Sequence, residues 1–174
     1  MIEGKNTFIR LMEEEDVPHK VDWFNDIEVR KTLNVNFPIS IIGTKKWLNN
    51  VSLNDSRKDF IICSSIDDVP VGYCGLVNID IKNSKAESYL GMGNKEYWGK
   101  GHASEARRLL LDYAFNELDL NKVYSYVWSA NEKMIHINKK VGYQVEGKLR
   151  DDVFHQGEFR DKLIMGLLKK EYIR

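Results

Sequence analysis

The chain has 174 residues, 43% of them hydrophobic and 30% charged, and its 26 basic and 26 acidic residues give a formal net charge of zero. This length suits one domain, residues 1–174, with a core of its own, and the balanced charge argues against broad electrostatic capture of nucleic acid. No apolar run approaches the roughly 18 residues of a membrane span, and the N-terminus lacks the apolar region of a signal peptide, so we expect no membrane partner.

In the first half of the chain, hydrophobic periodicity predicts helices followed by strands. Asp16 stands where it can cap the first helix, with Pro18 in the first turn, and Gly72 and Gly75 interrupt a long strand and indicate a bulge. The expected elements are a strand at 7–12, helices at 16–24, 26–33 and 44–54, and strands at 59–64 and 69–81.

The second half alternates strands and helices and ends in a hairpin. The expected elements are strands at 86–93 and 122–128, helices at 103–118 and 132–140, and paired strands at 143–151 and 159–168. Gly142 is placed to end the last helix in a left-handed conformation. The order of elements predicts an α/β (α+β) domain whose mixed, mostly antiparallel sheet of about seven strands carries helices on both faces.

Both cysteines, Cys63 and Cys74, lie in apolar, strand-like runs. They show neither a metal-ligand spacing nor a disulfide framework. We therefore expect two buried free thiols, a reducing cytoplasm and no metal site.

The most informative segment is Tyr-Trp-Gly-Lys-Gly-His-Ala at positions 97–103, directly before an amphipathic helix. Glycines at alternate positions let a ligand approach the backbone, and the first N–H groups of a helix favour an anion. Lys100 adds positive charge, so the segment indicates a diphosphate site. A glycine turn that only caps the helix is the alternative.

Two other phosphate-binding motifs do not fit this segment. A P-loop needs a different spacing before Gly-Lys-Ser/Thr, and a dinucleotide fingerprint needs a third glycine where Ser104 stands. The pattern Trp98-x-x-Gly101-x-Ala103 instead resembles the acyl-CoA pyrophosphate loop of the GNAT superfamily of N-acetyltransferases, in the branch typified by ribosomal-protein N-terminal acetyltransferases.

Further segments carry the same resemblance, in the order that the family has them. Asn131 to Tyr143 is similar to the family's Asn-to-Gly-Phe/Tyr signature. The segments 23–30 and 46–48 resemble the N-terminal helices of that branch, and 146–150 with 157–161 resemble its C-terminal hairpin. The resemblance implies a GNAT fold in which the strands at 86–93 and 122–128 splay apart, with the pantetheine arm of acetyl-CoA, the co-substrate, lying between them.

The resemblance also implies a set of CoA-binding residues. The phosphate loop would supply them together with the strand backbone and Asn131, for which a helix N-cap is the alternative role. They are Gly91, Met92, Gly93, Trp98, Gly99, Lys100, Gly101, His102, Ala103, Ser104 and Asn131. We expect His102 to contribute only its backbone N–H.

Acetyl transfer to an amine needs a group that removes a proton and a donor that holds the oxyanion, and it needs no metal. Glu87 is the expected base, acting through water, and a solvated charge at a hairpin end is the alternative. Reserve candidates in the final hairpin are Asp151, Asp152, His155 and Glu158.

Asn138 departs from the family pattern, because many members place a tyrosine here as general acid for the leaving thiolate. Asparagine has no proton to give up at neutral pH. We expect Asn138 to orient the thiol by a hydrogen bond while solvent supplies the proton. An ordinary polar position on the helix surface is the alternative.

The sequence leaves the identity of the acceptor amine undetermined. Trp23, Phe37 and Tyr89 are expected to wall its pocket, and Arg30 and Arg150 would either bind an acidic acceptor or form exposed salt bridges. A small-molecule amine, such as an amino sugar, a polyamine or a drug, is favoured over a protein N-terminal amine. A CoA-binding sensor or assembly module without activity is the competing class. The sequence is also compatible with a homodimer, because the exposed edge strands of two copies can pair.

Overall fold

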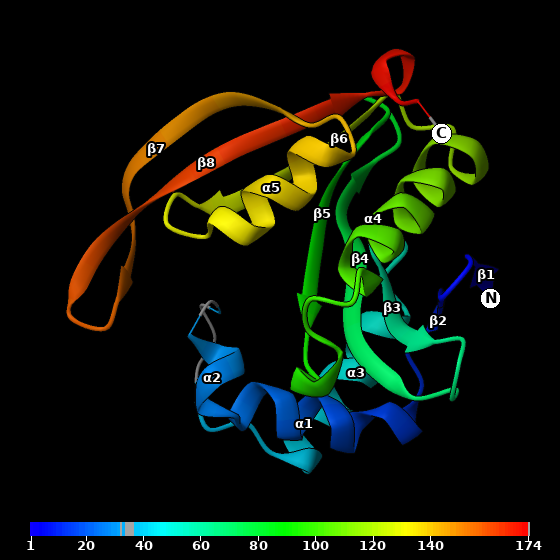
Figure 1. The fold of residues 1–174 in the computed structure, drawn as a ribbon, viewed down its shortest axis with the longest axis vertical. Coiled ribbons are helices and arrows are strands. Elements are labelled where there is room, and N and C mark those ends of the chain that lie inside the picture. Colours follow the sequence, from blue (N-terminus) through cyan, green and yellow to red (C-terminus); the bar gives the residue numbers. More distant parts are fainter. Residues whose placement is uncertain (32, 34–36, 174) are drawn as a thin grey trace.

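The structure, a computed structural model, describes residues 1–31, 33 and 37–173. Its strands form an eight-stranded sheet in the order β1-β2-β3-β4-β5-β6-β8-β7 (Figure 1). All neighbouring strands are antiparallel except β5 and β6, which are parallel. The strands are β1 (Ile2–Glu3), β2 (Thr7–Leu11), β3 (Lys58–Ser64), β4 (Pro70–Asp80), β5 (Lys85–Met92), β6 (Lys122–Trp128), β7 (Gln144–His155) and β8 (Glu158–Leu168).

The expected sheet is therefore confirmed, with one strand more than anticipated. The additional strand, β1, is only two residues long, which is too short to show the alternation on which strand prediction depends. The register of β3 against β4 shifts between Ile62 and Cys63, opposite Gly72, where an irregularity was expected.

Helices cover both faces of the sheet, as expected. Neighbouring residues of β3 point to opposite sides: Ile61 packs with Trp23 and Leu48 of the N-terminal helices, and Ile62 packs with Leu110 of α4. The helices are α1 (Val17–Asn25), α2 (Ile27–Arg30), α3 (Ile41–Ser52), α4 (His102–Asp112) and α5 (Glu132–Lys140), with short 3-10 turns at Glu14–Asp16, Lys95–Tyr97 and Lys169–Glu171.

Two expectations about the helices were wrong, on the cap of α1 and on the end of α2, and a third helix has the expected length but changes type near its end. Asp16 makes no side-chain cap to α1, because its buried carboxylate binds Arg10 at 2.7 Å and accepts the N–H of Glu13. The helix expected at 103–118 is α-helical only to Asp112 and continues as a π-helical turn, Tyr113–Glu117. The second helix ends at Arg30 rather than at residue 33, and Thr32 lies outside the described residues.

Both cysteines are buried free thiols, as expected. Burial raises the pKa of Cys63 to about 11 and that of Cys74 to about 12. Gly142 has a φ of +105° directly after α5, in agreement with its expected role. Within the described ranges, none of the helices is long and apolar enough to cross a membrane.

Candidate active site

A cavity opens where β5 and β6 separate. These parallel strands pair only between residues 85–87 and 122–124, and beyond that point β5 continues to Met92 and β6 to Trp128. The space between them measures about 540 Å³ and is walled by both strands, α2, β4 and the first two turns of α4 and α5. This volume falls in the range of small-molecule sites. The expected splaying of the two strands is confirmed.

The first turn of α4 forms one end of this cavity. Gly99 and Gly101 have φ angles of +76° and +91°, and a Cβ atom on either would meet nothing within 4 Å. Backbone conformation, rather than lack of space, therefore requires glycine at both positions. Gly101 is the N-cap of α4 and provides no side-chain cap, so the first N–H groups of the helix remain available for an anion. This open cradle fits a diphosphate.

Other residues of the loop surround this cradle. Trp98, Gly99 and Ala103 line the cavity. The other loop residues, Lys100, Gly101, His102 and Ser104, are not among its lining residues. The Nζ atom of Lys100 lies 5.0 Å above the ring of Tyr97. Lys100 therefore adds positive charge at the outside of the loop and not inside the cavity.

His102 turns its side chain away from the cavity. Its Nδ1 atom lies 2.9 Å from the hydroxyl of Thr7, and only 4% of the residue is exposed. Burial lowers the pKa of His102, which favours the neutral ring. The imidazole thus fastens α4 to β2, and only the backbone N–H of this residue can serve a ligand.

The backbone of β5 points alternately towards β4 and towards the cavity. The N–H of Gly93 donates to the carbonyl of Val71 at 3.0 Å, so Gly93 faces β4 and does not line the cavity. The indole N–H of Trp98 donates to the carbonyl of Met92 at 3.1 Å. Met92 and Leu90 therefore present backbone groups to the cavity, and both line it. Leu90 was missed because an apolar strand residue gives no chemical signal in the sequence.

Two tyrosines form the wall on the side of α1. Tyr89 donates its hydroxyl to Asp59, which Arg57 binds through both carboxylate oxygens at 2.7 Å. The Tyr73 hydroxyl is buried without a hydrogen-bond partner among the described residues, and it lies 2.4 Å from the position of a Cβ on Gly91. Burial raises the pKa of both phenols, so both keep their protons at neutral pH.

Two of the three expected acceptor residues lie elsewhere. Tyr89 lines the cavity, but Trp23 and Phe37 do not. Trp23 is 7% exposed and stacks on Tyr73, since Gly93 leaves space for its ring. Phe37 is 51% exposed and lies 3.6 Å from the guanidinium of Arg30. Their aromatic character therefore serves packing in this structure, and Tyr73 is an aromatic residue of the cavity wall that was not expected.

The two asparagines of α5 differ in position. Asn131 lines the cavity and caps α5 by accepting the N–H of Met134 at 3.1 Å. Asn138 is fully buried and is not among the lining residues; its Nδ2 lies 3.7 Å from the sulfur of Met165, and its Oδ1 has no partner within the described chain. The side chain of Asn138 therefore faces β8 instead of the cavity.

Glu87 lies at the closed end of the cleft and does not line the cavity. Its carboxylate accepts the side-chain N–H of Asn78 at 2.9 Å. Strand alternation puts Glu87 on the same face as Tyr89 and Gly91, with about 7 Å between successive side chains on that face. Any action of Glu87 on the cavity must therefore pass through water.

The reserve candidates in the β7–β8 hairpin form contacts of their own. Asp152 pairs with Lys162 at 2.9 Å and Glu158 with Arg160 at 3.0 Å. His155 packs on Trp128, with 4.6 Å between ring centroids, so it lies behind a residue of the cavity wall. None of the reserve candidates, Asp151 included, lines the cavity.

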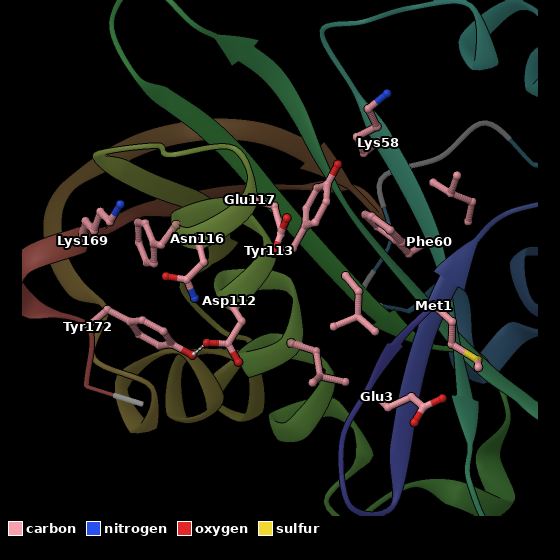
Figure 2. Close-up of a pocket in the computed structure, with 14 residues that line it drawn as sticks. Met1, Glu3, Lys58, Phe60, Asp112, Tyr113, Asn116, Glu117, Lys169 and Tyr172 are labelled. Atoms are coloured by element: carbon pink, nitrogen blue, oxygen red, sulfur yellow. Dashed lines mark hydrogen bonds between the residues drawn. The ribbon is translucent and has the colours of Figure 1, made fainter.

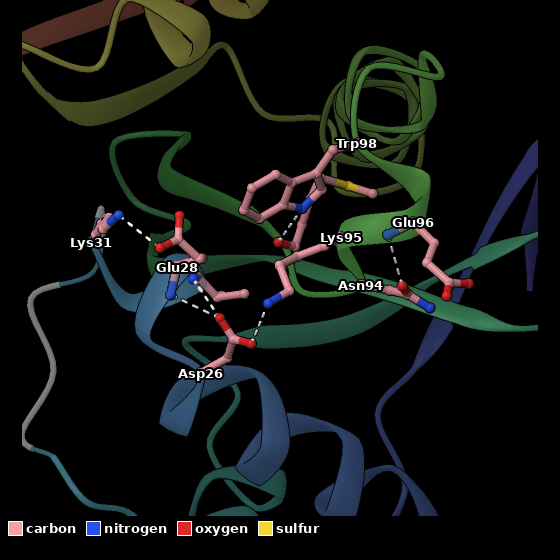
Figure 3. A network of polar contacts seen from close by, with 9 residues as sticks. Asp26, Glu28, Lys31, Asn94, Lys95, Glu96 and Trp98 are labelled. Carbon is pink, nitrogen blue, oxygen red and sulfur yellow. Dashed lines mark hydrogen bonds and ion pairs between the residues drawn. The ribbon is translucent and has the colours of Figure 1, made fainter.

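Two ion pairs lie near the entrance of the cavity. Figure 3 shows Lys95, in the segment before the phosphate loop, binding Asp26 at the start of α2 at 2.6 Å. In the same view Glu28 pairs with Lys31 at 2.8 Å, and both residues line the cavity. The Lys95–Asp26 pair joins the N-terminal helices to the segment before the phosphate loop, whereas Glu28 and Lys31 pair within the end of α2.

A larger cavity of about 1,020 Å³ lies at the other end of α4 (Figure 2). Its walls come from β1, the π-helical turn and the C-terminal residues Lys169 and Tyr172. It contains neither the free N–H groups of α4 nor the splayed strands, so the chemistry of acetyl transfer has no basis there. Among the described residues, no cluster of three or more metal-ligating side chains occurs in either place.

Comparisons with known proteins agree with this geometry. A family model described as "Acetyltransferase (GNAT) domain" matches residues 6–144. The N-acetyltransferase p20 of Bacillus licheniformis is 34% identical over 168 residues, which cover 94% of this chain and 93% of that protein. The spermidine N(1)-acetyltransferase of Escherichia coli K12 is 35% identical over 120 residues, covering 69% of this chain and 63% of its own length.

Solved structures share the fold. The spermidine N-acetyltransferase of Vibrio cholerae, in complex with CoA and spermine, superposes with a TM-score of 0.89 at 24% identity, covering 98% of this chain and all of the other. At this identity the similarity concerns the fold alone.

Proposed function

Because the chain belongs to the GNAT acetyltransferase family and is an acetyl-CoA-dependent N-acetyltransferase, we propose that its acceptor is the primary amine of a small molecule. The observation that carries this proposal is the cavity of about 540 Å³ between β5 and β6, closed on the acceptor side by Tyr73 and Tyr89. A protein N-terminus would bring several residues of chain with it, whereas a cavity of this volume suits a compact acceptor.

The chain's own residues suggest how the co-substrate is held. The cradle of Gly99, Gly101 and the first N–H groups of α4 suits the diphosphate, and backbone groups of Leu90 and Met92 suit the amide arm. When bound, acetyl-CoA supplies the thioester that the amine attacks. The Tyr73 hydroxyl, which lies beside Gly91 at the cavity wall and has no partner among the described residues, is our proposed hydrogen-bond partner for the incoming amine.

The charges of the cavity bear on the type of amine. Glu28 is the one carboxylate among the described lining residues, and it is paired with Lys31. The neighbouring residues outside the described part of the chain, Thr32, Asn34, Val35 and Asn36, bring no carboxylate. A second ammonium group of a polyamine would thus lack a counter-charge, whereas a monoamine or amino sugar needs none. Polyamines remain the second candidate because relatives are named spermidine acetyltransferases.

Proton removal is proposed to pass through water. Glu87 remains our proposed base, with a chain of water along the face of β5 that it shares with Tyr89. Glu28 enters as a competitor, since its carboxylate lines the cavity. For Asn138, the orientation towards Met165 gives no support to a direct hydrogen bond to the thiol.

The test begins with calorimetry using acetyl-CoA, followed by a thiol-release screen. The amine classes are monoamines and nucleotide-linked amino sugars, aminoglycosides, polyamines, and peptides with a free N-terminus. CoA release with an amino sugar or monoamine supports the proposal, whereas a clear preference for spermidine contradicts the charge argument. Preference for peptides would instead support the ribosomal-protein branch, and binding without release from any amine would support a sensor or assembly module.

A further inference from the structure

Arg107 of α4 is a buried cation without a counter-ion in the described part of the chain. It is 1% exposed and lines the cavity. Its Nη1 donates to the hydroxyl of Ser88 at 2.9 Å, its Nη2 contacts the sulfur of Met134 at 3.4 Å, and its Nε has no partner. The ring of Tyr143 lies 5.7 Å from the guanidinium carbon. No carboxylate among the described residues pairs with this charge.

Such an arrangement is costly unless a ligand completes it. A buried charge is normally paired, because transfer from water into a protein interior removes its hydration. A guanidinium has five N–H donors, and a thioether is only a weak acceptor. The unmatched charge at the cavity wall therefore indicates an anionic group on the bound ligand.

The position of Arg107 tells which anion this is. The diphosphate cradle ends at Ala103, and Arg107 lies one helical turn further along α4. Its partner Ser88 precedes Leu90 on β5 and donates to the carbonyl of Tyr124 at 3.2 Å, where the two strands are still paired. An arm that starts at the cradle and follows β5 inward thus ends beside Arg107, and the end of the CoA arm is its sulfur.

We propose that Arg107 binds the sulfur of CoA and stabilises it as the thiolate. This inference rests on the use of acetyl-CoA in the proposed function. When the amine nitrogen bonds to the acetyl carbon, the carbon–sulfur bond breaks, its electron pair stays on sulfur, and the nitrogen loses a proton to water. The guanidinium keeps its own protons throughout and offsets the charge on sulfur. Arg107 thereby makes a proton donor at position 138 unnecessary.

The experiment is a pH titration of bound CoA, followed by the ultraviolet absorbance of its thiolate as a difference between loaded and unloaded protein. The protein's own thiols do not interfere below about pH 9, since the pKa values of Cys63 and Cys74 are about 11 and 12. A neighbouring cation lowers the pKa of an acid by about 1–3 units, and an ordinary thiol titrates near ~8.5. We expect bound CoA to titrate at least one unit below free CoA.

Matched variants decide whether Arg107 is the cause. Arg107→Met should return the pKa of bound CoA to its free value or above, and Arg107→Lys should keep part of the shift. Arg108→Met removes the same charge from the next position, which does not line the cavity, and should titrate like the wild type. Thermal unfolding checks each fold; if Arg107→Met does not fold, the comparison is made with Arg107→Lys and Arg107→Gln.

The outcomes distinguish failure of the proposed function from failure of the role proposed for Arg107. Failure of the wild type to bind CoA in calorimetry would remove the proposed function itself. Tight binding with an unshifted thiol pKa, or an equal shift in the wild type and in Arg107→Met or Arg107→Gln, would overturn only the role of Arg107. A raised pKa in the Met or Gln variant, with CoA binding retained, supports it.

Discussion

Replacing Gly101 by alanine tests the diphosphate cradle at its most sensitive point. Gly101 has a φ of +91°, and a Cβ there would meet nothing within 4 Å, so the effect of a side chain is conformational rather than steric. A residue with a Cβ pays about 1–2 kcal/mol in the left-handed region. At about 1.4 kcal/mol per factor of ten, this corresponds to a ~5- to 30-fold weaker affinity for CoA if the free loop relaxes to another shape.

The cost can also appear as lost stability, if the loop keeps its shape without CoA. The assay therefore combines calorimetry with CoA and urea unfolding of the free protein, and the two changes in free energy are added. Gly157→Ala is the matched control, because Gly157 has a φ of +84° and equal free space but lies in the β7–β8 turn. It should lose stability by a similar amount and bind CoA normally.

The sum for Gly101→Ala should reach about 1–2 kcal/mol. A sum near zero would mean that the loop around bound CoA does not need the left-handed conformation, and the cradle would not be the binding site. An equal loss of CoA affinity in Gly157→Ala would show that the measurement reports general destabilisation. A Val at position 101 should be worse than Ala, because β-branched residues tolerate positive φ least.

Three further substitutions address the proton path, the acceptor and the buried charge of Lys20. Glu87→Gln should lower turnover at neutral pH and leave the affinity for acetyl-CoA intact, because an amide cannot take up the proton. A normal rate in Glu87→Gln, together with a lowered rate in Glu28→Gln, would assign the role of base to Glu28. Tyr73→Phe removes a buried hydroxyl that has no partner among the described residues, so thermal stability should not fall. The KM for the acceptor should rise about 5-fold, the value of one hydrogen bond of ~1 kcal/mol, and an unchanged KM would exclude contact with the acceptor. Burial lowers the pKa of Lys20 from 10.5 to about 8, so the unfolded state binds this proton more tightly than the folded state, and the stability that depends on Lys20 rises with pH above about 8. The unfolding free energy of the wild type minus that of Lys20→Met should therefore rise by about 1 kcal/mol from pH 7 to 9. A difference that stays constant over this range would contradict the lowered pKa.

The fold was predictable where periodicity is long and uninterrupted. The strand Lys122–Trp128 and the helix Glu132–Lys140 have the bounds expected from the sequence, since alternation and helical spacing extend over their whole length. The backbone conformation of the loop before α4 was predictable for a similar reason, because Gly99 and Gly101 are glycines where the chain has a positive φ. Both kinds of signal are local in the chain.

Residues whose importance comes from tertiary burial were not predictable. Arg107 is one of two adjacent arginines on an amphipathic helix, where solvent exposure is the ordinary expectation, and only packing against Ser88 and Met134 reveals the unpaired charge. Tyr73 was hidden in an apolar strand, and its free hydroxyl depends on the space left by Gly91. No local pattern distinguishes these side chains from ordinary core residues.

Asn138 and Arg107 are best understood together. Asn138 lies one turn after Met134 on α5, and Met134 contacts the guanidinium of Arg107 from the opposite helix. Asparagine cannot protonate a leaving thiolate, whereas a guanidinium stabilises it by charge alone and stays protonated at every physiological pH. In an enzyme built this way the alkaline side of the pH–rate profile carries no contribution from a general acid. The rate would then rise with the fraction of neutral amine until the thioester itself is hydrolysed. The leaving sulfur would be stabilised by Arg107 of α4 instead of by a proton donor on α5.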